Sequence, residues 1–251
     1  MTSASAWYLG IGADAVGEAA ILVGDPARIP RLAAQLHDPR IVSERRGLRT
    51  VTGLHRGHRI SASAFGMGAP IAAIVLHELF ALGVHTFLRI GTAMAMPPAT
   101  LGSFVLADGA LRAEGTSATY APLGYPAVAD FELNACLRNR LAAGTRPWHA
   151  GVFASYDGFY TEMFALDADR RGPIESVRAE MHRLRLLAID METATLLTAG
   201  RVLGARTSSL CLATVDAASQ AKLDAAALAE AEQALFAVAL DALADDAQRQ
   251  T

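Results

Sequence analysis

The sequence predicts an α/β fold in which strands and helices alternate along the chain. Short apolar runs that end in glycine alternate with longer segments whose apolar residues recur at helical spacing. This alternation is typical of a layered α/β domain. The chain has 251 residues, and no linker, repeat or low-complexity tract divides it, so we expect one domain over residues 1–251. Its composition, 52% apolar and 19% charged, is enough for a sizeable core.

The first half of the chain is expected to begin the sheet. Residues 19–23 form an apolar run that predicts a buried strand. Pro26 then opens a helical pattern that continues to Leu36, and proline is favoured in a first helical turn. The further elements predicted here are antiparallel strands within 43–66, a helix over 69–82, and strands over 84–90 and 104–107.

The second half continues the alternation, with one irregular stretch. The elements predicted are a helix over 127–142, strands over 149–155 and 186–189, a helix over 192–203, a strand over 207–214 and a closing helix over 224–245. Residues 158–185 have the least regular pattern, with charged residues at 167–171 in the middle. An insertion or a lid is expected there.

Charge and cysteine content exclude several classes of protein. Lys and Arg number 22 against 25 Asp and Glu, so the basic excess of a nucleic-acid binder is missing. No uninterrupted apolar run reaches the ~18 residues of a membrane span, and no secretory signal pattern is present. Cys136 and Cys211 have no zinc-ligand spacing, so we expect no metal site, no disulfide framework and a cytoplasmic location.

Glycine-containing turns follow several predicted strands. They are Gly24-Asp25-Pro26-Ala27-Arg28, Gly66-Met67-Gly68-Ala69-Pro70 and Arg89-Ile90-Gly91-Thr92. Ligands of open α/β sheets bind beyond the carboxyl ends of strands, and glycine lets the backbone approach them. A helix start also favours anions. The first two turns are equally compatible with an ordinary structural connection.

Two charged motifs have both a structural and a functional interpretation. Arg89 lies among Phe87, Leu88 and Ile90, so it must meet either a carboxylate or a bound anion. Asp190-Met191-Glu192 follows an apolar strand. Its carboxylates either accept hydrogen bonds from sugar hydroxyls or cap the helix that follows.

Together and in this order, these motifs resemble the type I nucleoside phosphorylase family, and within it the uridine phosphorylases. The other matching segments are Ser43-Glu44-Arg45, residues 121–132 and Phe159-Tyr160. The resemblance extends from about residue 7 to the last helix, and residues 125–131 are especially close to the uridine branch. It implies a three-layer α/β/α fold with a mixed central sheet.

The resemblance also implies a reaction, the reversible phosphorolysis of a nucleoside to a free base and a pentose 1-phosphate. Inorganic phosphate would be the co-substrate, with no metal or organic cofactor. The implied phosphate ligands are Gly24, Arg28, Arg89 and Thr92, joined from a neighbouring subunit by Arg45. Met191 and Glu192 would contact the ribose. A site shared in this way implies at least a homodimer, and related uridine phosphorylases are hexamers.

The resemblance implies that Arg89 and Glu192 are catalytic residues. Cleavage of an N-glycosidic bond passes through an oxocarbenium-like sugar, so the task is mainly positioning and electrostatics. Asp216 is a candidate general acid for the leaving base, or else a surface or capping aspartate. Six of the seven histidines match no catalytic position of the family and are expected to be structural or at the surface: His55, His58, His77, His85, His149 and His182.

The chain departs from the uridine pattern on the base side. Met163 and Ala165 stand where uridine phosphorylases carry the Gln and Arg that bind the uracil edge. Met94 replaces a small glycine. Because an unmet polar edge is costly, we expect a more apolar pocket, lined also by Phe159, that does not prefer uridine.

Other departures affect the sugar and ion sites. Tyr8 stands where many members carry a His that reaches a neighbour's sugar site, and a phenol still donates a hydrogen bond. Asp190 replaces the first Glu of the usual Glu-Met-Glu. Arg46 and Ile71 replace two residues of a monovalent-cation site, so we expect that site to be lost.

Two other functions stay open from the sequence. A hydrolytic nucleosidase of the same fold would use water and would not benefit from three phosphate-facing arginines. A non-catalytic binder of a nucleoside or sugar phosphate is suggested by the altered base pocket.

Overall fold

The structure is a computed structural model that describes residues 5–250, and both strands and helices occur along its whole length. The first elements are β1 (Ala19–Val23), α1 (Arg28–Ala33), β2 (His37–Arg45), β3 (Leu48–His55), β4 (His58–Ala64), α2 (Ala69–Ala81) and β5 (Thr86–Ala95). They are followed by β6 (Phe104–Ala113), β7 (Ala127–Val128), α3 (Phe131–Ala143), β8 (Trp148–Tyr156), the π-helical turn η3 (Phe159–Met163) and α4 (Ala168–Arg183). The last are β9 (Ala188–Asp190), α5 (Thr193–Leu203), β10 (Arg206–Asp216) and α6 (Ala225–Gln250).

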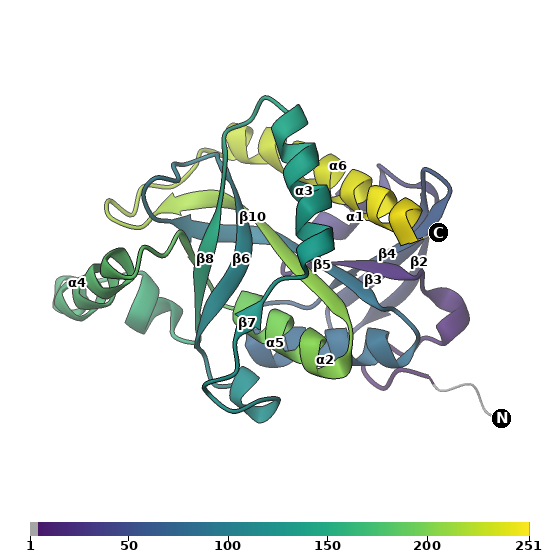
Figure 1. Cartoon of the computed structure of the whole chain (residues 1–251), viewed down its shortest axis with the longest axis horizontal. Helices are drawn as coiled ribbons and strands as arrows, with labels where there is room; N and C mark the ends of the chain where they lie inside the picture. The colour runs from purple at the N-terminus through teal and green to yellow at the C-terminus, as the bar shows by residue number, and fades with distance from the viewer. Residues whose placement is uncertain (1–4, 251) are drawn as a thin grey trace.

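The strands of the described part form one mixed sheet between two layers of helices (Figure 1). The order is β10-β6-β8-β9-β5-β1-β4-β3-β2, with β7 beside β6. β1 is parallel to β4 and β5, whereas β6 is antiparallel to β10. β10 also pairs with β5, so five of the strands close into a ring. The expected mixed sheet is confirmed.

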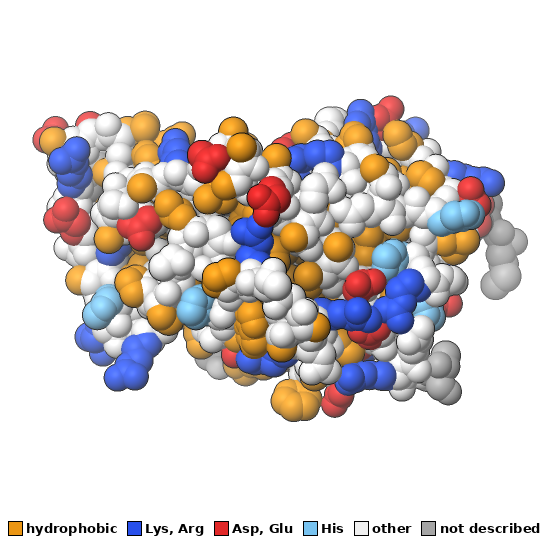
Figure 2. Space-filling view, turned by 90° about the horizontal axis from the view of Figure 1, so that it is seen from above, with side chains coloured by type: hydrophobic (Ala, Val, Ile, Leu, Met, Phe, Trp, Pro, Cys, Tyr) orange, Lys and Arg blue, Asp and Glu red, His pale blue; other side chains and the backbone are white. Residues whose placement is uncertain are grey.

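Two apolar layers hold the helices against the sheet. α2 and α5 pack on one face, with Leu76, Leu79 and Leu196 in the contact. α1, α3 and α6 pack on the other, through residues such as Leu137 and Phe236. On the side seen in Figure 2, acidic and basic side chains are interspersed. No helix within residues 5–250 is long and apolar enough to cross a membrane.

Two predicted helix boundaries were wrong. The helix predicted to reach Leu36 ends at Ala33, and residues 34–36 form the turn that leads into β2, in which Asp38 has a left-handed φ of 47°. The helix predicted from residue 127 begins at Phe131. Residues 127–128 instead pair with β6, and the Asp130 carboxylate caps α3 by accepting the N–H of Leu133 at 2.9 Å.

The stretch 158–185 is more regular than its sequence indicates. It contains η3 and the 16-residue helix α4. Gly172 and Pro173 interrupt the pattern there, and both disfavour helices. Ile174 and Met181 are nevertheless buried, and Val177 packs beside Met181. This i, i+3, i+7 spacing is what docks α4 on the fold.

Candidate active site

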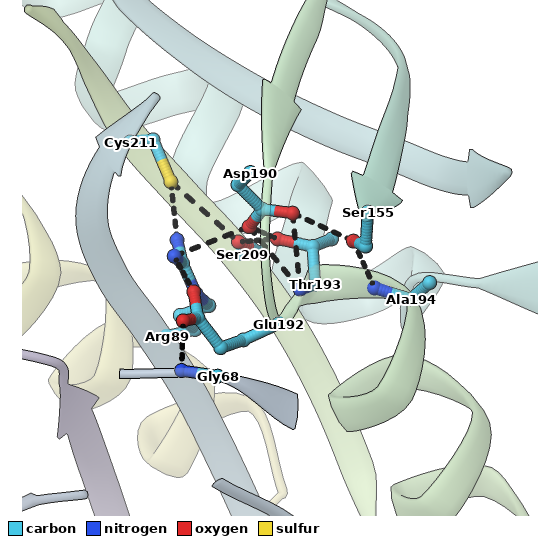
Figure 3. A network of polar contacts seen from close by, with 9 residues as sticks. All are labelled: Gly68, Arg89, Ser155, Asp190, Glu192, Thr193, Ala194, Ser209 and Cys211. Carbon is cyan, nitrogen blue, oxygen red and sulfur yellow. Dashed lines mark hydrogen bonds and ion pairs between the residues drawn. The ribbon is translucent and has the colours of Figure 1, made fainter. Parts of the chain in front are cut away.

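Arg89 is the centre of a buried polar network at the middle of the sheet (Figure 3). It lies in β5, and its Nη2 is 2.6 Å from Glu192 Oε2 and 3.1 Å from Asp190 Oδ2. Its Nη1 donates to the sulfur of Cys211 at 2.6 Å. The carboxylate partners that a buried arginine requires are therefore supplied by the chain itself.

The ion pairs keep Arg89 charged. Burial alone would lower the pKa of Arg89, but Cys211, Asp190 and Glu192 together raise it above its usual value. Burial raises the pKa of Cys211 to about 11, so the sulfur is a neutral thiol near pH 7. The Arg89 Nε is buried and has no hydrogen-bond partner within the described residues. An unpaired buried donor of this kind suits a bound acceptor.

Asp190 caps the start of α5, which was one of its two interpretations, and it also contacts Arg89. It accepts hydrogen bonds from the Thr193 backbone N–H at 3.1 Å and from the Thr193 hydroxyl at 2.5 Å, at the start of α5. The Ser155 hydroxyl, at the end of β8, donates to its other oxygen at 2.6 Å. Asp190 is thus fixed by two elements and in turn holds Arg89.

Glu192 connects three segments that are distant in the sequence. One oxygen pairs with Arg89, and the other accepts the backbone N–H of Gly68 at 2.7 Å. Gly68 has a φ of 98°, which favours glycine, and directly precedes α2. The Glu192 side chain makes no capping hydrogen bond to α5. Its two oxygens instead join the starts of α2 and α5 to β5.

The glycines at the strand ends lie close to this network. Val23 of β1 pairs with Ile90 of β5, so Gly24 follows β1 beside Gly91. The Gly66 N–H donates to the Gly24 carbonyl at 2.9 Å, and a Cβ on Gly24 would lie 2.9 Å from the Gly66 carbonyl oxygen. The three strand ends are therefore packed backbone to backbone. Thr92 follows Gly91 in β5 and is half-buried.

Arg28 has a partner that the sequence did not indicate. Its Nε lies 2.7 Å from Glu232 Oε1 in α6, and Arg31 Nη1 contacts the other oxygen of Glu232. Glu232 is separated from Arg28 by 204 positions, so no local pattern could have paired them.

Tyr8 and Arg45 lie at the far end of α2 from Gly68. The N–H groups of Tyr8 and Leu9 donate to the Glu78 carboxylate at 2.7 and 2.9 Å. Ten residues of helix separate Gly68 from Glu78, or ~15 Å at the helical rise. The exposed Arg45 side chain lies against Gly10, next to the same segment. The structure does not bring either residue to the Arg89 network of its own chain.

The candidate base-pocket residues gather in one apolar cluster. Met94 and Met163 are buried in it, and Phe159 and Met191 pack against it. Ala165 lies beyond, and its backbone N–H is bound by the Gln220 side-chain carbonyl at 2.8 Å, with that amide oriented to suit its neighbours. Gln220 is the first of two residues that contact the 163–165 segment and that the sequence did not point to.

Arg178 of α4 is the second such residue. Its Nη2 donates to the Met163 carbonyl at 3.3 Å and to the same Gln220 side-chain carbonyl at 3.1 Å. Burial lowers the pKa of Arg178. Arg178 and Gln220 therefore tie the 163–165 segment to the loop that follows β10. No sequence motif marked them, because both act on backbone groups.

Asp216 matches its capping interpretation. Its carboxylate accepts the Ser219 hydroxyl and the Ser219 N–H, both at 2.7 Å, and these bonds lower the pKa of Asp216. A carboxylate held in its ionised form is a poor proton donor at neutral pH. Across residues 5–250, no group of three or more His, Cys, Asp or Glu side chains is arranged to hold a metal ion.

Comparison with known proteins places this site in a family. The model of the phosphorylase superfamily matches residues 18–244. Uridine phosphorylase from Thermococcus kodakarensis is 34% identical over 194 residues, which are 76% of this chain and 70% of that protein. Guanosine phosphorylase from Halorubrum lacusprofundi is 35% identical over 202 residues, 80% of this chain and 78% of that protein.

A solved structure gives the same result for the fold. Uridine phosphorylase from Vibrio fischeri superposes with a TM-score of 0.87 at 28% identity, covering 96% of this chain and 97% of that one. The resemblance of the sequence motifs is thereby confirmed. The chain therefore belongs to the phosphorylase superfamily, and within it to the type I nucleoside phosphorylases of the uridine phosphorylase-like kind.

Proposed function

We propose that this enzyme catalyses the reversible phosphorolysis of a nucleoside whose base is held in an apolar pocket, giving the free base and a pentose 1-phosphate. The observation that carries the proposal is the buried Arg89, which joins Asp190 and Glu192, keeps an unpaired Nε and has its guanidinium next to Gly91 of β5. The uridine and guanosine phosphorylases among its relatives support the reaction type.

In the proposed mechanism, Glu192 acts on the sugar. Its carboxylate accepts hydrogen bonds from the ribose hydroxyls, while Arg89 and the Gly68 N–H hold it in place. A phosphate oxygen attacks C1′ as the bond to the base nitrogen breaks, and the electron pair leaves with the base. The negative charges of Glu192 and of phosphate stabilise the oxocarbenium-like sugar between them. We assign Asp216 no proton transfer in this scheme.

Phosphate requires more positive charge than Arg89 supplies, because one guanidinium already faces two carboxylates. We propose that Arg28 and the Gly24 backbone bind phosphate from the β1 turn, with Thr92 from β5. Arg45 would come from a neighbouring subunit, and so would Tyr8, toward the ribose. The distance of these two residues from their own chain's network supports a shared site in a homo-oligomer. The exposed Trp7, at 81%, lies in the same N-terminal segment.

For the base, we propose a pocket formed by Met94, Phe159, Met163 and Ala165. Methionine is adaptable and makes favourable contacts with aromatic rings, so such a pocket would hold a base by stacking and packing. Neither Met163 nor Ala165 has a side chain that could satisfy the polar edge of uracil. Discrimination by base would then be shallower than in a pocket built on hydrogen bonds.

The test is the release of free base from purine, pyrimidine and modified nucleosides, assayed with and without inorganic phosphate. We expect phosphate-dependent release, with uridine not the preferred substrate. Release that phosphate does not affect would instead support a hydrolytic nucleosidase. Ligand binding without bond cleavage across the panel would support a non-catalytic binder.

Arg45→Ala gives a specific test of the shared site. We expect the KM for phosphate to rise about tenfold or more, because a hydrogen bond to a charged group contributes ~1.5–3 kcal/mol. The KM for the nucleoside and the melting temperature should change little, since Arg45 is exposed. Arg49→Ala is a matched control, because Arg49 pairs with Glu44 on the same hairpin. An unchanged phosphate KM would remove Arg45 from the site.

A further inference from the structure

Apart from Asp246, which pairs with Arg206, Glu232 is the buried acidic residue of α6. It is 3% exposed, and its buried neighbours in α6 include Ala231, Leu235 and Phe236. Its partners are Arg28, at 2.7 Å, and Arg31. An unpaired carboxylate here would be costly, whereas an apolar residue would suit the packing as well or better. The charge at this position therefore calls for a reason beyond the fold.

The geometry of Arg28 supplies that reason. Arg28 is the first residue of α1 and follows the glycine turn of β1, where Asp25 accepts the Ala27 N–H at 2.8 Å. Glu232 engages Arg28 through Nε alone. Within the described residues no hydrogen bond is found for the two terminal nitrogens of Arg28, although its side chain is only 11% exposed. The guanidinium is thus held by its inner edge, and its terminal nitrogens are left to donate to a ligand.

Arg31 fixes the carboxylate in turn. It contacts the second oxygen of Glu232, so the carboxylate lies between two guanidinium groups rather than neutralising one. The cluster of Arg28, Arg31 and Glu232 keeps a net positive charge. An arginine side chain loses rotamer entropy when it binds a ligand. Holding it in place beforehand makes binding tighter.

We propose that Glu232 is a positioning residue for phosphate, acting through Arg28. This inference rests on the proposed phosphorolysis and on Arg28 as a phosphate ligand. Glu232 does not touch the substrate. It orients the Arg28 guanidinium at the carboxyl end of β1. Arg31 in turn holds the Glu232 carboxylate in place. The phosphate site therefore extends into α6, which closes the chain more than 200 positions after the β1 turn.

Two variants of Glu232 separate positioning from charge. Glu232→Gln retains an oxygen that can accept from Arg28 Nε, so we expect the phosphate KM to rise only about twofold. Glu232→Leu removes the acceptor at similar volume, and we expect a rise of about tenfold. The nucleoside KM, and kcat at saturating phosphate, should be unchanged. Glu230→Gln is the control, since Glu230 is two positions away on α6 and pairs with Arg146 at the surface.

The outcomes are distinct. A fall in the phosphate KM of Glu232→Leu would mean that Glu232 competes with phosphate for Arg28, and would overturn the proposal. A lower melting temperature with both KM values unchanged would show a purely structural role and would also overturn it. Calorimetry on the same variants measures the dissociation constant of inorganic phosphate without turnover. We expect it to rank the variants in the same order as the phosphate KM. If wild-type protein binds phosphate but cleaves no nucleoside, the proposed function fails while the role of Glu232 is still decided.

Discussion

Arg89→Ala is expected to reduce kcat/KM by ~10³-fold or more and to destabilise the protein by ~3–5 kcal/mol. The substitution leaves Asp190 and Glu192 buried and facing each other without the cation that both contact. It also removes the Nε–H that we assign to the ligand and the donor to Cys211. Steady-state kinetics and urea unfolding measure the two effects separately.

Arg138→Ala is the control for that experiment. Arg138 is 2.5 Å from Asp108, and both side chains are about two-fifths exposed. A solvent-exposed pair contributes only ~0–1 kcal/mol, so this variant should keep its activity and nearly all its stability. If Arg89→Ala behaved like Arg138→Ala, Arg89 would be neither a catalytic group nor the support of the network.

Glu192→Gln is expected to lower kcat by ~10²–10³-fold and to lower stability as well, because its single amide oxygen cannot accept from both Arg89 and Gly68. The amide oxygen can still accept the Gly68 N–H, so the start of α2 should stay in place. What is lost is the negative charge facing the sugar as it becomes cationic. Because phosphate is bound by other groups, its KM should change less than kcat. Single-turnover measurements would isolate the chemical step.

Asp246→Asn is the matched control, since Asp246 is another buried carboxylate paired with an arginine. Its Oδ2 lies 2.6 Å from Arg206, in a cluster that also includes Asp130. This variant should lose stability and retain kcat. A Glu192→Gln enzyme with unaltered kcat would contradict the assignment of Glu192 to the transition state.

Several parts of the fold could be predicted because their determinants are local. The apolar run at residues 19–23 is β1, and the helices predicted over 69–82 and 192–203 match α2 and α5 closely. Asp190 and Glu192 were recognisable as candidates because two carboxylates follow a buried strand directly. The errors fell where a distant partner decides the outcome, as when residues 127–128 pair with β6 instead of starting α3.

The motif order along the chain was sufficient to identify the family, and with it the mixed sheet and the residue types of the site. Three features depended on the folded chain. They are the carboxylate partners of Arg89, the residue that holds Arg28, and the end of α2 near which Tyr8 and Arg45 lie. The physical reason is separation in sequence. Arg89 lies 103 positions from Glu192, and Arg28 lies 204 from Glu232. Backbone propensities act over a few residues, whereas these ion pairs form only once the sheet and its two helical layers have packed together.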